Sequence, residues 1–164
     1  MENISEHISY KEAIRSTVAS MYGIDNTPNP DQLRAMKMVA RCIFEPVRNH
    51  FKVPIFISSF FRSLLLNSHP KVRGSKTSGH LTGEALDLDD VLGGVTNAQI
   101  FHFIKDNLDF DQLIWEFQDP NNPNSPAWVH ASYKSKEKNR RQVLRAIRFT
   151  DRGGKLRTKY VPYT

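Results

Sequence analysis

The chain has 164 residues, of which 39% are hydrophobic and 24% are charged, the balance of an ordinary globular protein with a single domain over residues 1–164. No apolar run approaches the roughly 18 residues of a membrane span, so membrane insertion is not expected. A single cysteine excludes an internal disulfide, and the net charge of +6 favours a polyanionic partner.

The first half of the chain predicts mainly helices. Residues 9–22 have the pattern of a short amphipathic helix. After a break with two prolines, Asp31 is expected to cap a second helix, which ends or kinks at Pro46 because proline disfavours helix in the residue before it. The apolar segment 53–60 predicts a strand, and 61–69 predicts a further helix.

The second half predicts mainly short strands. After Gly83 the residues alternate strictly, which indicates a strand over 85–89, and 97–107 predicts a helix. Further strands are expected over residues 110–117, 128–133, 141–149 and 155–163. Because helices come first and closely spaced strands later, we expect an α+β fold with N-terminal helices packed on a small, largely antiparallel sheet.

Three residues have the chemistry of a metal site. His80 lies in a glycine-flanked turn, Asp87 lies on the alternating strand, and His130 shares a strand face with Trp128 and Ser132. Two imidazoles and one carboxylate form a ligand set that zinc accepts, with water in the fourth position. The alternatives are a hydrogen-bonded His–Asp pair that stabilises a turn and a buried structural histidine at position 130.

The segment around these residues carries a family resemblance. "SGHLTGEALD" matches the S-x-H-x-x-G-x-A-x-D signature of the zinc D-alanyl-D-alanine carboxypeptidase family. "WVHASY" resembles the later W-x-H strand of that family, and "SSFFRSLLLN" resembles its S-G-Y-R-S…N segment. The family also contains D-Ala-D-Ala dipeptidases and phage endolysins. The resemblance spans Ser58 to Tyr133 and implies the small α+β fold shared with the Hedgehog signalling domain, the Hedgehog/DD-peptidase fold.

The resemblance implies roles for five residues. His80, Asp87 and His130 match the zinc ligands of the family. Arg62 matches the arginine that binds and polarises the substrate near the scissile bond, although it is also in a position to extend from a helix start as a structural residue. Ser78 matches a serine that contacts either the first ligand or the substrate.

The catalytic acid departs from the family pattern. Many relatives place an acid three residues before the last histidine, or a second histidine two residues before it, and these positions here are Ala127 and Trp128. Glu116 is the candidate substitute, because strand alternation places it on the face opposite Trp115 and Phe117. It could equally be a solvent-side strand residue. Trp128, which shares the face of His130, is a candidate substrate contact or a core residue.

The remaining reactive residues are expected to be structural. Cys42 lies in an apolar helical stretch and is read as a small core residue. Asp89 and Asp90 are expected to cap the turn that follows them. The other histidines lack ligand partners in the sequence and are expected to be surface or structural residues, namely His7, His50, His69 and His102.

We therefore expect a monomeric zinc metallopeptidase that cleaves peptidoglycan stem peptides, of the carboxypeptidase or endolysin type. The alternative is a non-catalytic, zinc-binding virion or cell-wall module of the same fold. Nucleic-acid binding by the basic C-terminal third would rest on charge alone and is not expected. The start of the chain lacks the features of a secretory signal, so synthesis in the cytoplasm and action at the wall after holin-type release, or from a virion, are expected.

Overall fold

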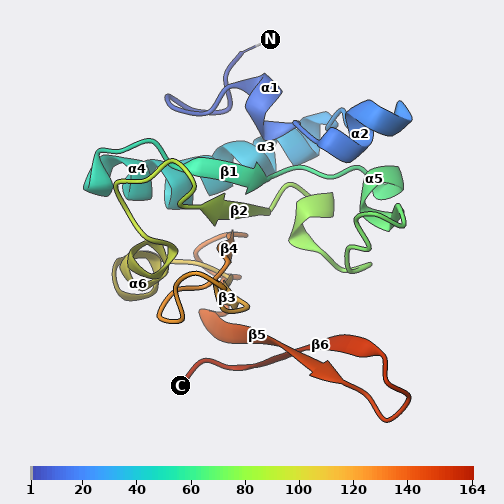
Figure 1. Cartoon of the computed structure of the whole chain (residues 1–164). Coiled ribbons are helices and arrows are strands. Elements are labelled where there is room, and N and C mark those ends of the chain that lie inside the picture. Colours follow the sequence, from blue (N-terminus) through green and yellow to red (C-terminus); the bar gives the residue numbers. More distant parts are fainter. Residues whose placement is uncertain (1) are drawn as a thin grey trace.

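The computed structural model describes residues 2–164, which form short helices around one mixed sheet (Figure 1). The α-helices are α1 (Tyr10–Ala13), α2 (Thr17–Tyr22), α3 (Pro30–Val39), α4 (Glu45–Phe51), α5 (Leu64–Ser68) and α6 (Asn97–Asn107). A π-helical turn, η1 (Ala40–Phe44), joins α3 to α4, and a 3-10 turn, η2 (Gly79–Leu81), precedes β2. The strands are β1 (Phe56–Ser59), β2 (Ala85–Asp89), β3 (Gln112–Glu116), β4 (Trp128–Ser132), β5 (Gln142–Thr150) and β6 (Leu156–Pro162).

The sheet has six strands in the order β1-β2-β4-β3-β5-β6. Every neighbouring pair is antiparallel except β3 and β5, which are parallel. In Figure 1 the N-terminal helices lie beside β1 and β2, whereas the β5–β6 hairpin lies at the far end of the molecule. The predicted α+β class with a largely antiparallel sheet is confirmed.

The pleat of the three central strands separates an apolar face from a polar one. Leu86 and Leu88 of β2, together with Val129 of β4 and Trp115 of β3, are buried in the hydrophobic core with the helices. The residues between them point to the opposite face, because successive side chains of a strand alternate. That opposite face carries the charged residues predicted from the sequence, such as Asp87.

The N-terminal helices differ from the prediction in their boundaries. Residues 9–22 form two helices, α1 and α2, because Ser16 starts a new helix by accepting a hydrogen bond from the backbone N–H of Ala19 at 3.2 Å. Asn29, and not Asp31, caps α3: its side chain accepts from the backbone of Gln32, whose own side chain accepts from the backbone of Asn29. This reciprocal capping box satisfies N–H groups that the start of a helix leaves free.

Pro46 does not end the helical segment that follows Asp31, because it lies at the second position of α4. The turn η1 precedes it, and within this turn the N–H of Glu45 bonds to the carbonyl of Ala40, five residues back. Because proline has no N–H and crowds the carbonyl four residues earlier, a wider turn lets the chain pass it and continue as α4. The helix therefore extends to Phe51, beyond the predicted end.

The strand β1 and the helix α5 are both shorter than predicted. The strand predicted over 53–60 covers only Phe56–Ser59, and the helix predicted over 61–69 covers only Leu64–Ser68. Ser63 is the N-cap of α5, since its side chain accepts from the N–H of Leu66. Arg62 consequently lies in the irregular connection before the helix.

Candidate active site

One cleft of about 830 Å³ on the polar face of the sheet contains every site residue predicted from the sequence. These residues come from the loop before α5, from η2 and its flank, and from β2, β3 and β4. They are Arg62, Ser78, His80, Asp87, Glu116, Trp128 and His130. The structure thus brings together residues that are separated by up to 68 positions in the chain, from Arg62 to His130 (130 − 62).

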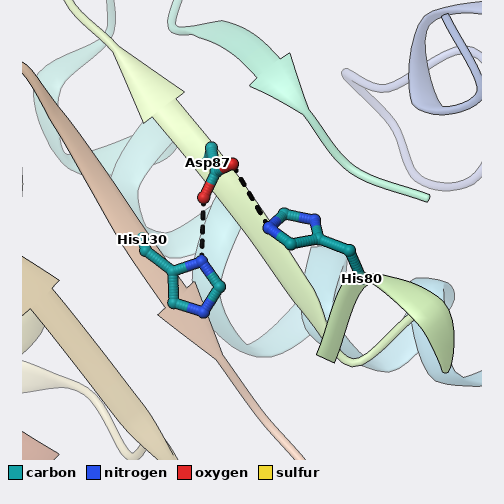
Figure 2. A group of neighbouring side chains, drawn as sticks. All are labelled: His80, Asp87 and His130. Carbon is teal, nitrogen blue, oxygen red and sulfur yellow. Dashed lines mark hydrogen bonds and ion pairs between the residues drawn. The ribbon is translucent and has the colours of Figure 1, made fainter. Parts of the chain in front are cut away.

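Asp87 lies at the centre of the metal-type cluster, between the two histidine rings (Figure 2). Its Oδ2 lies 3.2 Å from Nε2 of His80, and its Oδ1 lies 2.8 Å from Nδ1 of His130. The potential ligand atoms of the three residues all lie within 4.8 Å of one another. Asp87 and His130 are direct partners in the antiparallel register of β2 and β4, so the sheet itself sets their separation.

Two hydrogen bonds to the backbone and the tight turn at Gly83 fix His80 in place. Its Nδ1 donates to the carbonyl of Phe60 at 2.6 Å, and its own carbonyl accepts from the N–H of Arg62 at 3.1 Å. Gly83 lets the turn approach α3, because its φ is +76° and an added Cβ would lie 2.5 Å from the carbonyl oxygen of Gln32. The ring of His80 is therefore held from the β1 side and aimed at β2.

The protonation of His80 follows from these contacts. A carbonyl oxygen only accepts hydrogen bonds, so Nδ1 carries the proton and Nε2 presents a lone pair toward Asp87. Burial lowers the pKa of His80 by more than the neighbouring Asp87 raises it, which favours the neutral ring. Burial raises the pKa of Asp87, but the hydrogen bond that its carboxylate accepts from Nδ1 of His130 favours the charged form, and the pKa of this carboxyl group lies well below its usual range.

This arrangement fits a metal cation. Nε2 of His80 is fully buried and has no hydrogen-bond partner among residues 2–164. It faces a carboxylate oxygen, which is also an acceptor, and two acceptors at this distance repel unless a positive charge lies between them. A hydrogen bond from the opposite ring nitrogen to a carbonyl is the usual support for a metal-bound histidine. His80, Asp87 and His130 could therefore hold a divalent cation.

Arg62 lies at the edge of this cluster. Its guanidinium NH2 group is 4.0 Å from Oδ2 of Asp87, and its Nε is buried without a partner in the described chain. Burial lowers the pKa of Arg62, whereas Asp87 and Glu116 raise it, and at neutral pH the group remains charged. The guanidinium group of Arg62 thus brings positive charge to the edge of the cleft.

Glu116 lies in the same cleft and is only 6% exposed. Burial raises its pKa to about 7; His130 and Arg62 act against this shift, and Asp87 adds to it. A carboxyl group with a pKa near neutrality can both take up and release a proton under physiological conditions. The predicted orientation opposite Trp115 agrees with the structure, because Trp115 is in the core.

Phe117 departs from the prediction that it faces away from Glu116. Its backbone has a φ of +59°, in the left-handed region, so the alternation of β3 ends at Glu116 and the ring of Phe117 also lines the cleft. It lies next to the ring of Trp128, with centroids 5.3 Å apart. Sequence alternation could not detect this, because it assumes extended backbone throughout.

Some residues of the cleft were not singled out from the sequence. Ile114 of β3 and the β5–β6 residues Gln142, Leu144 and Tyr160 complete one side of the cleft. Alternation marks which residues share a face of each strand, but not that β5 pairs with β3. The missing information was therefore the strand order.

The other histidines have the structural surroundings expected for them. His7 pairs with Glu45, and His50 stacks on Phe103 with ring centroids 4.1 Å apart. His69 and His102 each lie against aromatic rings. Cys42 packs against the core as predicted.

Asp89 and Asp90 hold the turn after β2. The Asp89 carboxylate accepts from the N–H of Asp90, and the Asp90 carboxylate accepts from the N–H of Asn97 at the start of α6.

Among residues 2–164, none of the helices has the length and apolar character needed to cross a bilayer.

Comparison with known proteins identifies a family over most of this region. The family described as peptidase M15 matches residues 6–119, more than half of the chain. This segment contains Arg62, His80, Asp87 and Glu116, whereas His130 and the strands β4, β5 and β6 lie beyond it. No curated protein matches the chain.

Proposed function

The chain belongs to the peptidase M15 family, and from this premise we propose that it is a zinc-dependent peptidase that cleaves peptidoglycan stem peptides. Carboxypeptidase and endolysin-type cleavage are the two forms this activity would take. Action at the cell wall, after release or from a virion, is part of the proposal, and the positive net charge of +6 suits an anionic wall.

The observation that carries the proposal is the buried, unpartnered Nε2 of His80 facing Asp87. His80 and His130 provide two nitrogen ligands and Asp87 provides one oxygen ligand. This set is typical of catalytic zinc sites that keep one position open. Zinc in such a site polarises the scissile carbonyl and lowers the pKa of a bound water to about 7.

Glu116 is proposed to accept and then release the proton that peptide hydrolysis requires. Its carboxyl group is buried in the cleft, and a pKa of about 7 matches the requirement for a general acid–base group at neutral pH. It would take the place of the acid that many relatives carry near the last histidine, where this chain has Ala127 and Trp128.

Arg62, Ser78 and Trp128 are proposed to bind the substrate. Arg62 lines the cleft beside Asp87, and its charged guanidinium group would hold the scissile carbonyl oxygen or a substrate carboxylate. Ser78 lines the cleft two residues before His80, and its hydroxyl accepts from the backbone N–H of His80 at 3.4 Å. Trp128 offers an apolar ring on the same strand face as His130.

The rival function is a non-catalytic, zinc-binding module of the virion or cell wall. It is favoured by the residues three and two positions before His130, because neither Ala127 nor Trp128 can transfer a proton. Both functions predict a bound metal, and only the peptidase predicts turnover.

One paired experiment tests the proposal. Zinc-loaded protein is analysed for metal content and then incubated with purified peptidoglycan fragments, whose products are identified by mass spectrometry. We expect about one zinc per chain and new peptide termini that are absent when a chelator is added. Bound zinc without cleavage of any fragment would favour the rival module, and the absence of bound zinc would overturn both functions.

A further inference from the structure

The C-terminal hairpin of β5 and β6 forms one side of the cleft, although it lies outside the segment that matches the family. It contributes Gln142, Leu144 and Tyr160 to the cleft lining. In Figure 1 the hairpin extends from the sheet on the side away from the N-terminal helices. The family assignment therefore says nothing of what these three residues do.

Residues that pair directly across neighbouring strands form rows that cross the sheet. Two such rows run from the site residues into the hairpin. The row through the metal cluster consists of Asp87, His130, Ile114 and Leu144. The adjacent row, two residues along each strand, consists of Trp128, Glu116, Ala146 and Tyr160. Tyr160 is thus on the same row as the proposed proton carrier.

Ala146 is the only residue between Glu116 and Tyr160 in this row. Neighbouring strands are roughly 4.8 Å apart, so residues two strands apart in register are separated by about 10 Å at their backbones. Ala146 is completely buried and contributes only a methyl group. The longer side chains of Glu116 and Tyr160 therefore flank a small residue in this row, and both line the same cleft.

The phenol of Tyr160 is accessible and uncommitted. The residue is 54% exposed, so a ligand in the cleft can reach it. Burial, together with the Glu116 and Asp87 carboxylates, raises the pKa of Tyr160, whereas Arg62 lowers it. None of these influences is a hydrogen bond to another described side chain. At neutral pH the hydroxyl is protonated and is able to donate.

We propose that Tyr160 is a substrate-contacting residue whose hydroxyl donates a hydrogen bond to the carbonyl oxygen of the scissile peptide bond. This inference rests on the proposed peptidase function. The cleft has acceptors in Asp87 and Glu116, while Arg62 is the charged donor on the opposite side, next to the metal cluster. A peptide carbonyl that develops negative charge during hydrolysis needs donors, and Tyr160 supplies a neutral one from the hairpin side.

The test compares Tyr160→Phe, which removes only the hydroxyl, with Tyr160→Ala, which also removes the ring. Lys159→Ala is the matched control: Lys159 is the preceding residue of β6, points to the opposite face, and lies over the ring of Phe149. Cleavage is measured with a synthetic stem pentapeptide that ends in D-Ala-D-Ala. Binding of the same pentapeptide to chelator-treated, metal-free protein is measured by calorimetry, and thermal unfolding verifies that each variant is folded.

We expect Tyr160→Phe to lower kcat on the order of 10-fold to 100-fold, with KM changed less than about threefold, because the donor acts mainly on developing charge. Tyr160→Ala should in addition weaken binding of the pentapeptide to the metal-free protein, and Lys159→Ala should match the wild type in both assays. A folded Tyr160→Phe variant with kcat within about twofold of wild type would overturn the contact while leaving the peptidase function intact.

Failure of the peptidase function itself gives a different result. If the wild type binds the pentapeptide without cleaving it and both Tyr160→Phe and Tyr160→Ala weaken that binding, the hydroxyl contact with the peptide stands and the peptidase function falls. If the wild type neither binds nor cleaves the pentapeptide, or if Tyr160→Ala binds it as well as the wild type, the contact is overturned.

Discussion

Two trios of acidic and histidine residues in this protein look alike by distance alone. The first is His80, Asp87 and His130 in the cleft, and the second is Glu6, His7 and Glu45 near the N-terminus, with potential ligand atoms within 4.8 Å of one another in both. The first trio is buried or nearly so, and Nε2 of His80 has no hydrogen-bond partner in the described chain. The second trio is more exposed: the side chains of His7 and Glu45 are 31% and 15% exposed.

The difference lies in what else can satisfy the ligand atoms. In the N-terminal trio, Glu45 already accepts from the backbone N–H of His7 at 3.0 Å and pairs with its ring, and water reaches the remaining atoms. In the cleft trio, Asp87 accepts from Nδ1 of His130 through Oδ1, but the buried lone pair on Nε2 of His80 faces the other carboxylate oxygen, and a cation between these two atoms would compensate both. Proximity therefore indicates a metal site only when burial removes the alternatives.

The strongest test of this comparison removes one histidine from each trio. His130→Ala should lose the bound zinc and essentially all peptidase activity, because a three-ligand site that loses one ligand no longer holds its metal at working concentrations. His7→Ala should keep both, since the N-terminal trio contributes no residue to the cleft. Metal content and stem-peptide cleavage are measured for both variants, and equal metal loss in the two would show that the wrong trio was chosen.

A second test separates binding of the metal from proton transfer within the cleft. Glu116→Gln should retain the zinc content of the wild type, because no ligand changes and the side chain keeps its shape. Turnover should fall by a factor on the order of 10²–10⁴, the usual contribution of a positioned acid–base group. The measurement is stem-peptide hydrolysis at matched zinc content, and a loss under about threefold would exclude Glu116 from proton transfer.

A third test uses the pH dependence of stability in metal-free protein. The pKa of Glu116 is raised from 4.5 to about 7 by folding, so its burial destabilises the native state as pH rises from 4.5 through 7. Glu116→Gln carries no such penalty. The Tm of the variant minus the Tm of the wild type should therefore increase by about 5 °C when the pH is raised from 5 to 8. A difference in Tm that does not change with pH would contradict the burial of this carboxyl group.

The smallest effect is expected at the exposed trio. The His7–Glu45 pair is partly exposed, and such pairs typically contribute about 0–1 kcal/mol to stability. His7→Ala should therefore lower the free energy of unfolding by less than about 1 kcal/mol in a urea titration. A loss of several kcal/mol would mean that this trio is more tightly coupled to the core than its exposure indicates.

Local sequence patterns were sufficient to predict which side chains of a single strand face the cleft. Asp87 faces the cleft because β2 alternates, and Glu116 does so for the same reason on β3. The rule failed at Phe117, where a positive φ ends the alternation. The predicted helix cap at Asp31 was also wrong, because Asn29 caps α3 instead and Gln32 completes a reciprocal pair with it.

The sequence by itself determined the ligand types, the strand faces and the helix-to-strand order, because these follow from interactions within a few residues of the chain. Only the tertiary structure decided that β4 pairs with β2, which places His130 beside Asp87, and that β5 pairs with β3. The second pairing brings Tyr160 into the cleft with Glu116. Strand order depends on long-range pairing and on burial of a shared core, and neither is encoded in the spacing of any one segment.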